Sequence, residues 1–401
     1  MTAGKTQLKR RVFKNRPTGC RTGERKTVMT SRERVARVLN HEMPDRVPVD
    51  IGSTASGIVN DTFFELKKYY GVTSEDVCFR PDESAAYYND DLLEKLGGDF
   101  RHLFLLPPDG YHFEFDENGY GVNEWGIMKK SVSGVCVQHC STPLEDAEIE
   151  DIDSYPWPDP YAPGRARGIR ERAEYLYKHT DYAIAARAVS HGIFELAWEM
   201  RGMENFLCDM ITDKEFANKL LDKILELQIG FYDVLLSKCG EYVQIVETAD
   251  DYGTQNGQFM SNELFRELIL PRRKKLNEFI KSKAPKAKIF HHTCGSVYGL
   301  MEELIECGID ILNPVQPTAK DMDTDRLERE FGDRLIFHGS IDEQTALVGS
   351  LEDLKTEMKT RISTLGRHGG YIMAPTSNFQ NDMPMENIVN FTRMAHELGQ
   401  Y

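Results

Sequence analysis

The feature of this sequence that most limits its possible folds is a series of eight short apolar runs rich in β-branched and aromatic residues. Most of them are separated by segments with the apolar period of a helix, each long enough to cross back over a sheet. Strands that alternate with helices predict a parallel sheet buried on both faces. The runs span residues 46–52, 99–106, 182–189, 242–251, 288–295, 309–314, 335–342 and 370–376, and the helical segments include residues 215–238, 262–283, 297–307 and 351–365.

Eight strands with intervening helices are what a (β/α)8 TIM barrel requires. A doubly wound open sheet would give a similar alternation, but no predicted strand is followed by the Gly-x-Gly-x-x-Gly of a dinucleotide-binding fold. The sequence therefore predicts an α/β protein with a TIM-barrel fold. Its 401 residues lie within the size range of one barrel that carries insertions.

Two segments depart from this alternation. Residues 107–163 are rich in aromatic residues, glycines and prolines, and the turn-forming stretch Asp116–Gly119 predicts a β-hairpin insertion that serves as a lid, a docking surface or simple decoration. Residues 1–28 contain nine Lys or Arg, one acid and no helical period, which predicts a disordered basic extension. The barrel itself is expected to occupy residues 29–401.

Composition narrows the class of protein further. The net charge is −15 in spite of the basic extension, which argues against nucleic acid as the main partner. No run of 18 apolar residues and no signal-peptide core occurs, so we expect a cytoplasmic protein without membrane contact. The eight cysteines have no regular spacing and are expected to be reduced thiols.

Residues capable of chemistry stand at or just after the ends of the predicted strands. The active site of a barrel lies at the carboxyl ends of its strands, so these side chains are expected to meet there. Asp250 and Asp251 are predicted to orient substrate, or to supply one ligand and one helix cap. His191 is predicted to contact substrate or to cap the next helix. The full set is Asp50, Arg187, His191, Glu247, Asp250, Asp251, Asn313 and Ser340.

His292 and Cys294 form the sharpest chemical signal. They stand one residue apart at the end of a predicted strand, and alternate strand residues share a face, so both can point at one object. Imidazole and thiolate are donors that zinc accepts, and a catalytic zinc site needs three protein ligands with one position open. The alternative is a structurally satisfied histidine beside an inert cysteine.

The set of motifs in this chain resembles the uroporphyrinogen decarboxylase superfamily, and most closely its corrinoid-dependent methyltransferase branch. The resemblance extends from about residue 30 to the end and implies a TIM barrel, in agreement with the strand count. It is carried by Thr30-Ser-Arg-Glu-Arg-Val, Pro44-Asp-Arg-Val-Pro-Val-Asp50, Asp250-Asp-Tyr-Gly-Thr-Gln255, Phe290-His-His-Thr-Cys-Gly295, His338-Gly-Ser-Ile-Asp342 and Pro384-Met-Glu-Asn387.

The resemblance implies different chemistry in its two branches. Decarboxylases of this kind use no metal and bind the carboxylates of a tetrapyrrole through an Arg-Gln-Ala-Gly-Arg-Tyr type motif. The corresponding region here, Val49–Gly57, has no arginine. The methyltransferases bind zinc through a His-x-Cys pair and a late cysteine, and the metal activates a methyl acceptor. His292 and Cys294 match the pair, which favours this branch.

The third zinc ligand does not match. Where the resemblance places a late cysteine, Ala374–Asp382 has no sulfur. Either an oxygen ligand replaces it, with Glu247 and Asp250 the nearest candidates, or the metal site is weakened or lost. We predict His292, Cys294 and Glu247 as the metal ligands.

The resulting prediction is a methyltransferase that moves a methyl group between a small molecule and a corrinoid. A separate protein would carry the corrinoid as methylcobalamin and dock over the insertion, and the chain itself is a possible homo-oligomer. The alternatives are metal-free decarboxylation of a tetrapyrrole carboxylate and a non-catalytic porphyrin- or corrinoid-binding protein. Predicted catalytic residues are Asp250, Asp251 and His191, and predicted substrate-binding residues are Asp50, Arg187, Asn313, Ser340 and Asn378.

Overall fold

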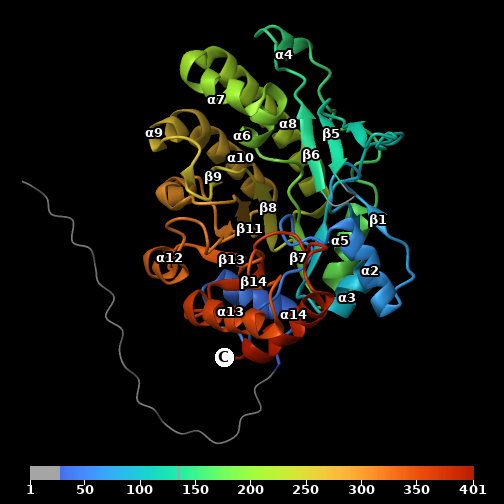
Figure 1. Ribbon diagram of the computed structural model, residues 1–401, viewed down its shortest axis with the longest axis vertical. Helices are drawn as coiled ribbons and strands as arrows, with labels where there is room; N and C mark the ends of the chain where they lie inside the picture. Colours follow the sequence, from blue (N-terminus) through green and yellow to red (C-terminus); the bar gives the residue numbers. More distant parts are fainter. Residues whose placement is uncertain (1–27, 133–135) are drawn as a thin grey trace, which may run out of the picture.

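The computed structural model describes residues 28–132 and 136–401, so most of the predicted basic extension lies outside the described residues. Its central element is a seven-stranded sheet in which all neighbours are parallel, in the order β14-β13-β12-β11-β8-β7-β3 (Figure 1). The strands are β3 (Phe100–Leu103), β7 (Ala183–Ala186), β8 (Ile245–Ala249), β11 (Lys288–His292), β12 (Ile311–Asn313), β13 (Ile336–Ile341) and β14 (Tyr371–Pro375).

A short segment around Val49 closes this sheet into a barrel. Val49 forms a parallel bridge with Met373 of β14. On its other side, the amide of Asp99, just before β3, donates to the Val49 carbonyl at 2.8 Å. The segment therefore joins the two edge strands. All eight predicted runs contribute to the wall, and the predicted TIM barrel is confirmed.

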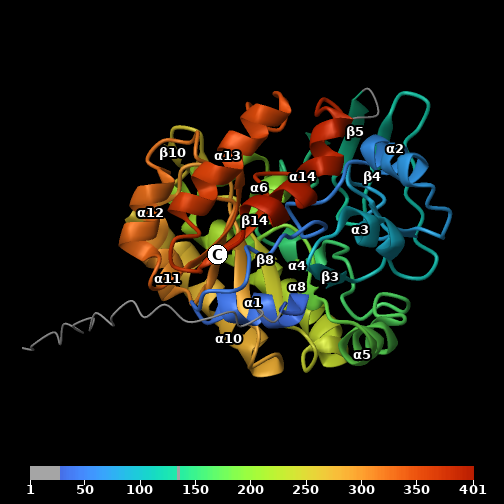
Figure 2. The ribbon, with the colours of Figure 1, turned by 90° about the horizontal axis from the view of Figure 1, so that it is seen from below.

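Helix α1 (Ser31–Leu39) closes the amino-terminal end of the barrel (Figure 2). Thr30 and Glu33 form a capping box that starts the helix. Its buried face, Val35, Val38 and Leu39, joins one apolar cluster with residues from the early part of the strands, among them Phe100, Ile245, Phe290, Ile311, Ile336 and Ile372. Because this end is filled, a ligand approaches the barrel from its carboxyl end, where the active sites of such barrels lie.

The other helices form the outer layer around the barrel (Figures 1 and 2). No helix within residues 28–132 and 136–401 combines the length and the apolar character that a membrane span needs. The helices are α2 (Asn60–Tyr70), α3 (Asp90–Leu96), α4 (Asp151–Ser154), α5 (Ile169–His179), α6 (Ile193–Arg201), α7 (Met203–Thr212), α8 (Lys214–Cys239), α9 (Asn262–Leu264), the π-helical Phe265–Ile269, α10 (Leu270–Lys283), the 3-10 turn Tyr298–Leu300, α11 (Met301–Glu306), α12 (Thr324–Phe331), α13 (Leu351–Thr364) and α14 (Met385–Leu398).

The segment between β3 and β7 carries an antiparallel sheet of β4 (Tyr120–Val122), β5 (Met128–Val132) and β6 (Cys136–Ser141). The predicted turn at Asp116–Gly119 is present, with the Gly119 amide donating to the Asp116 carbonyl at 2.9 Å, but it precedes β4. The turn that joins β4 to β5 lies at Asn123–Gly126. The Asn123 side chain explains the difference, because its Oδ1 accepts hydrogen bonds from the amides of Trp125 and Ile127. Short two-stranded pairs are formed by β1 (Val77–Cys78) with β2 (Tyr87–Tyr88) and by β9 (Gly253–Thr254) with β10 (Gly257–Gln258).

Candidate active site

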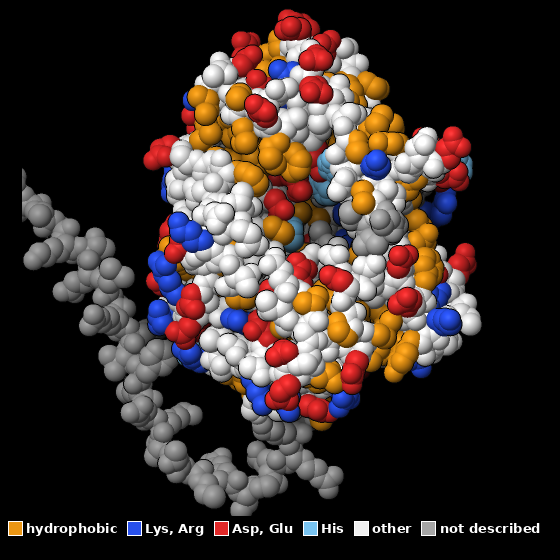
Figure 3. Space-filling model, viewed as in Figure 1, with side chains coloured by type: hydrophobic (Ala, Val, Ile, Leu, Met, Phe, Trp, Pro, Cys, Tyr) orange, Lys and Arg blue, Asp and Glu red, His pale blue; other side chains and the backbone are white. Residues whose placement is uncertain are grey.

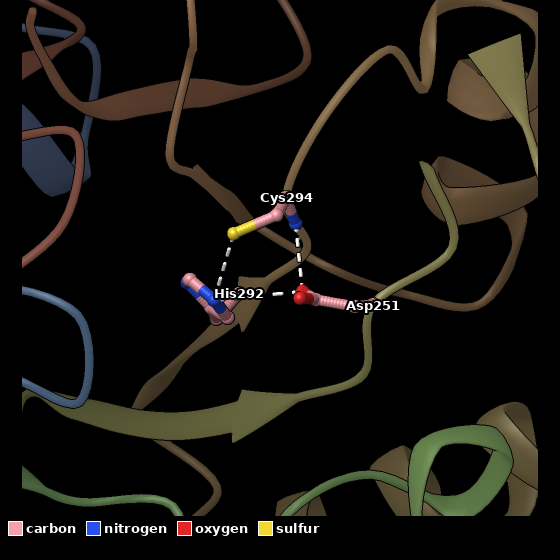
Figure 4. Close-up of side chains that lie close together, drawn as sticks. All are labelled: Asp251, His292 and Cys294. Atoms are coloured by element: carbon pink, nitrogen blue, oxygen red, sulfur yellow. Dashed lines mark hydrogen bonds and ion pairs between the residues drawn. The ribbon is translucent and has the colours of Figure 1, made fainter. Parts of the chain in front are cut away.

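Three side chains from two neighbouring strand ends form a cluster at the carboxyl end of the barrel (Figure 4). His292 is the last residue of β11, Cys294 follows two positions later, and Asp251 follows the end of β8 by two positions. The Nε2 atom of His292 lies 3.4 Å from the Sγ atom of Cys294 and 3.5 Å from Oδ1 of Asp251. The structure thus brings the predicted His-x-Cys pair together with one of the predicted catalytic acids.

The donor atoms of this cluster fit a zinc ion. With ordinary zinc–ligand bond lengths, a tetrahedral site separates N from S by about 3.5 Å and N from O by about 3.4 Å. The observed separations from His292 Nε2 are 3.4 Å to sulfur and 3.5 Å to oxygen. The amide of Cys294 also donates to Asp251 Oδ1 at 2.8 Å, which holds the carboxylate beside the thiol. Three protein ligands would leave one zinc position for a substrate.

A chain of hydrogen bonds orients His292. Its Nδ1–H donates to Oδ1 of Asn313 at 2.7 Å, so the lone pair of Nε2 is directed at the cluster. The amide group of Asn313 donates in turn to Nδ1 of His338 at 2.8 Å, and Nε2 of His338 donates to Oδ2 of Asp50 at 3.0 Å. Asn313 and Asp50 were both predicted to bind substrate. In the structure they instead help to orient His292 through this chain of hydrogen bonds.

Cys294 holds its proton in the absence of a metal. Burial, with a further contribution from Asp251, raises the pKa of the Cys294 thiol well above its usual value. Zinc binds thiolate, so occupation of the site would release this proton. A raised thiol pKa also means that Cys294 is a poor free nucleophile, which favours a ligand role over a covalent one.

Glu247, predicted as the third ligand, lies in a different buried cluster with Asp50 and His102. Its Oε2 atom accepts hydrogen bonds from the amide and the hydroxyl of Thr54, at 2.7 and 2.6 Å. In the register of the two strands Glu247 stands opposite Phe290, whereas His292 stands opposite Ala249. Glu247 is therefore two residues, about 6.6 Å, deeper in the barrel than His292. Asp251 occupies the place beside His292 and Cys294 that was expected for Glu247.

Asp250 has structural partners on both of its oxygens. They accept hydrogen bonds from the first three amides of α6, those of Ile193, Phe194 and Glu195, at 2.8–3.1 Å. Oδ2 also lies 2.8 Å from both Arg273 Nη2 and the Tyr252 hydroxyl, and the carboxylate is fully buried. A Cβ atom on Gly192 would lie 2.1 Å from Asp250 Cγ, so this approach requires glycine. These contacts favour the helix-capping alternative for Asp250 over direct catalysis.

His191 belongs to an acidic group next to the cluster. Its Nδ1 atom lies 2.7 Å from Oε1 of Glu199, and Glu195 stands one helical turn before Glu199 on α6. Burial alone would lower the pKa of His191, but the Glu199 carboxylate, the strongest opposing influence, raises it to about 10, so the ring is an imidazolium at neutral pH. Burial raises the pKa of Glu195 well above its usual value, so this carboxyl retains a proton.

We expect His191→Gln to lower the free energy of unfolding by about 1.5–3 kcal/mol near pH 6, the range for hydrogen bonds to charged groups. The folded pKa of about 10 exceeds the unfolded value of about 6.5, so this stabilisation is complete below pH 6.5 and disappears as the pH rises through 10. Urea unfolding of both proteins between pH 6 and 10 measures it. A difference that stays constant or grows with pH would contradict the assignment.

A cavity of about 140 Å³ opens beside His292, and residues of the predicted site contribute to its walls. His191, Arg187 and Asn378 line it, together with Glu195. Figure 3 shows histidine and acidic side chains inside the hollow on this face. Asp50, Asn313 and Ser340 are fully or almost fully buried and do not contribute to the lining; Ser340 instead makes a 3.0 Å hydrogen bond with the Tyr371 hydroxyl.

Several residues of the site were not predicted from the sequence. Glu195 could have been predicted, because His191, Glu195 and Glu199 are spaced by four residues immediately after a predicted strand. His102 and His338 were also readable as inward-facing polar residues of strands. Arg80 and Glu83, which line the cavity from the loop between β1 and β2, follow no periodic pattern and had no signal in the sequence.

Comparison with known proteins agrees with this fold. A methyltransferase from Methanosarcina mazei superposes with a TM-score of 0.61 at 19% sequence identity, covering 92% of this chain and 99% of that chain. A β-1,4-D-mannanase from Cryptopygus antarcticus gives a TM-score of only 0.38 at 11% identity, covering 90% and 92%. No curated protein matches the sequence.

The family model for uroporphyrinogen decarboxylase (URO-D) matches residues 139–398. This range includes six of the eight positions of the barrel wall, all except β3 and the Val49 segment, and every residue of the His292 cluster. It covers more than half of the sequence. The chain therefore belongs to the uroporphyrinogen decarboxylase (URO-D) family.

Proposed function

We propose that this protein is a methyltransferase that moves a methyl group between a small molecule and a corrinoid carried by a partner protein. The observation that supports the proposal most strongly is the group of imidazole, thiol and carboxylate donors formed by His292, Cys294 and Asp251. These residues would hold zinc, with Asp251 in place of the predicted Glu247. The likeness in fold to a methyltransferase agrees with this reading.

When bound, zinc would supply Lewis-acid activation of the heteroatom that gains or loses the methyl group. The chain's own residues orient this chemistry. Asn313 fixes the ring of His292, and the amide of Cys294 fixes the carboxylate of Asp251. Glu195 retains a proton at its carboxyl group and lines the same cavity, so it can share that proton with a substrate heteroatom.

The dimensions of the cavity favour a small substrate. Pockets for drug-sized ligands measure roughly 300–1,000 Å³, whereas the cavity beside His292 measures about 140 Å³. A tetrapyrrole carboxylate exceeds this space. Asp50, the carboxylate that would orient a tetrapyrrole, is 2% exposed and lies between His102 and His338. The decarboxylase alternative therefore has less support, and the partner's corrinoid would approach from the open carboxyl end of the barrel.

A methyl-transfer assay tests the proposal, with free methylcobalamin in place of the partner-bound corrinoid. Zinc-loaded protein is mixed anaerobically with methylcobalamin and a small thiol or phenol, and the reverse reaction uses the reduced corrinoid with a methyl thioether or methyl ether. The visible spectrum should report demethylation or methylation of the cobalt, dependent on zinc. A spectral shift without turnover would indicate a binding protein, and no reaction in either direction from zinc-replete protein would overturn the proposal.

A further inference from the structure

The cavity beside His292 is lined by positively charged side chains as well as by a candidate metal ligand. His292 is the candidate ligand, and Arg80 and Arg187 supply two guanidinium groups. Arg187 follows β7 directly, and Arg80 lies in the loop between β1 and β2. Elements distant in the sequence thus bring two positive charges to one small space that also borders the candidate zinc cluster.

Arg187 is a buried cation without a carboxylate in contact. It is 4% exposed, its Nη1 donates to the Gly52 carbonyl at 2.7 Å, and its guanidinium lies 4.6 Å from the centre of the Phe79 ring. Its Nε–H is buried without a hydrogen-bond partner. Among the described residues no carboxylate lies within 4.0 Å of it, although an uncompensated buried charge is strongly unfavourable.

Arg80, like Arg187, has no carboxylate in contact among the described residues. Its Nη2 donates to the carbonyl of Ala188, directly after Arg187, and within the described part of the chain it forms no ion pair closer than 4.0 Å. Both guanidinium groups line the same cavity, and burial, followed by the charge of Arg80, lowers the pKa of Arg187 to about 10. An anion between the two guanidinium groups would relieve the repulsion.

Within the described residues, the acids around the cavity form no ion pair within 4.0 Å with these two cations. Glu83 is in contact with Lys129, whose Nζ lies 2.5 Å from Oε1. Burial would raise the pKa of Glu83, but Lys129, His191 and, least of the three, Arg80 lower it to about 2. Glu195 retains its proton and is neutral. Glu247 and Asp50 act on Arg187 only from beyond contact distance.

We propose that the small-molecule substrate carries a carboxylate, which binds between Arg187 and Arg80 while its methyl-bearing atom faces His292. This inference rests on the proposed function and names the substrate class for the same cavity. Arginine recognises carboxylates through two parallel N–H bonds, which fixes orientation as well as charge. The amide oxygen of Asn378 accepts from the Gly57 amide at 2.9 Å, which directs its NH₂ group towards other acceptors at the cavity.

The size of the cavity limits the body of this substrate. A cavity of roughly 150 Å³ accommodates a benzene molecule, and the cavity here measures about 140 Å³. The substrate class is therefore a methylated monocarboxylate with a body no larger than one six-membered ring. A molecule with several carboxylates, such as a porphyrinogen, would find only this one pair of arginines in the cavity.

Binding measurements without any corrinoid test the inference. Calorimetry compares methoxyacetate, benzoate and 4-methoxybenzoate with their primary amides, which have nearly the same shape but no charge. At least one acid should bind about 10-fold or more tightly than its amide, and this preference should be lost in both Arg187→Met and Arg80→Met, because each variant removes one of the two charged donors that recognise the carboxylate. Circular dichroism verifies that each variant is folded.

Arg101→Met is the matched control, because Arg101 is also a buried strand arginine that stacks on an aromatic ring, 3.6 Å from the centre of Tyr182, but does not line the cavity. It should retain the preference for acids. Equal binding of acids and amides, binding of no acid, or a preference that survives in folded Arg187→Met and Arg80→Met would overturn the inference. Because neither methyl transfer nor corrinoid enters the measurement, its failure is distinguishable from failure of the proposed function.

Discussion

Asp250→Asn is expected to lower the free energy of unfolding by about 3–5 kcal/mol, the range for breaking a buried ion pair. Asp250 pairs with Arg273, and both side chains are at most 1% exposed. The same carboxylate accepts from three amides at the start of α6, so the substitution would also place an amide NH₂ group among hydrogen-bond donors. Urea unfolding followed by circular dichroism measures the change.

The adjacent residue provides the control for this effect. Asp251 is 28% exposed at its side chain and accepts hydrogen bonds from Cys294 alone among the described residues, including one from its amide. Asp251→Asn should therefore change stability by about 1 kcal/mol or less. If Asp250→Asn proved as stable as Asp251→Asn while methyl transfer was abolished, Asp250 would be catalytic, as the sequence-based prediction proposed, and its structural role would be secondary.

His292→Ala and Cys294→Ser are each expected to reduce methyl transfer by about a thousandfold or more. Lewis-acid activation contributes several kcal/mol, and each 1.36 kcal/mol corresponds to a factor of ten in rate. Removal of either donor leaves two protein ligands from the cluster. Initial rates in the methylcobalamin assay, with zinc in the buffer, measure the loss.

His291→Gln is the matched control for the zinc-site variants. His291 is the neighbour of His292 but points to the opposite side of β11, where its Nδ1 lies 2.8 Å from the Thr248 hydroxyl. This variant should retain activity to within a few fold once it is shown to be folded. Activity that survived in His292→Ala but fell in His291→Gln would place the chemistry on the other face of the strand.

The fold was predictable because its signals are local. The helical period predicted 215–238 and 351–365, where the structure has α8 (Lys214–Cys239) and α13 (Leu351–Thr364). Because each strand is buried on both faces, it is a short apolar run in the sequence. Eight such runs match the number of strands in the wall of a TIM barrel. The shared direction of His292 and Cys294 was predictable for the same reason, since it depends on the two-residue period of one strand.

The third member of the cluster depends on the register between two strands, which sequence does not reveal. Glu247 and Asp251 lie on the same stretch of chain, and only the pairing of β8 with β11 decides which of them reaches His292. The role of Asp250 depends on a contact with α6 more than fifty positions away in sequence. Arg80 reaches the cavity from an irregular loop, and such positions carry no periodic signal.

Metal content tests the central claim most directly. Elemental analysis of protein purified anaerobically without chelators should find about one zinc per chain in the wild type. Asp251→Asn should lose most of this zinc, whereas Glu247→Gln should retain it, because only Asp251 lies within reach of His292 and Cys294. Wild-type protein without zinc, or zinc lost in Glu247→Gln but retained in Asp251→Asn, would contradict this account of the site.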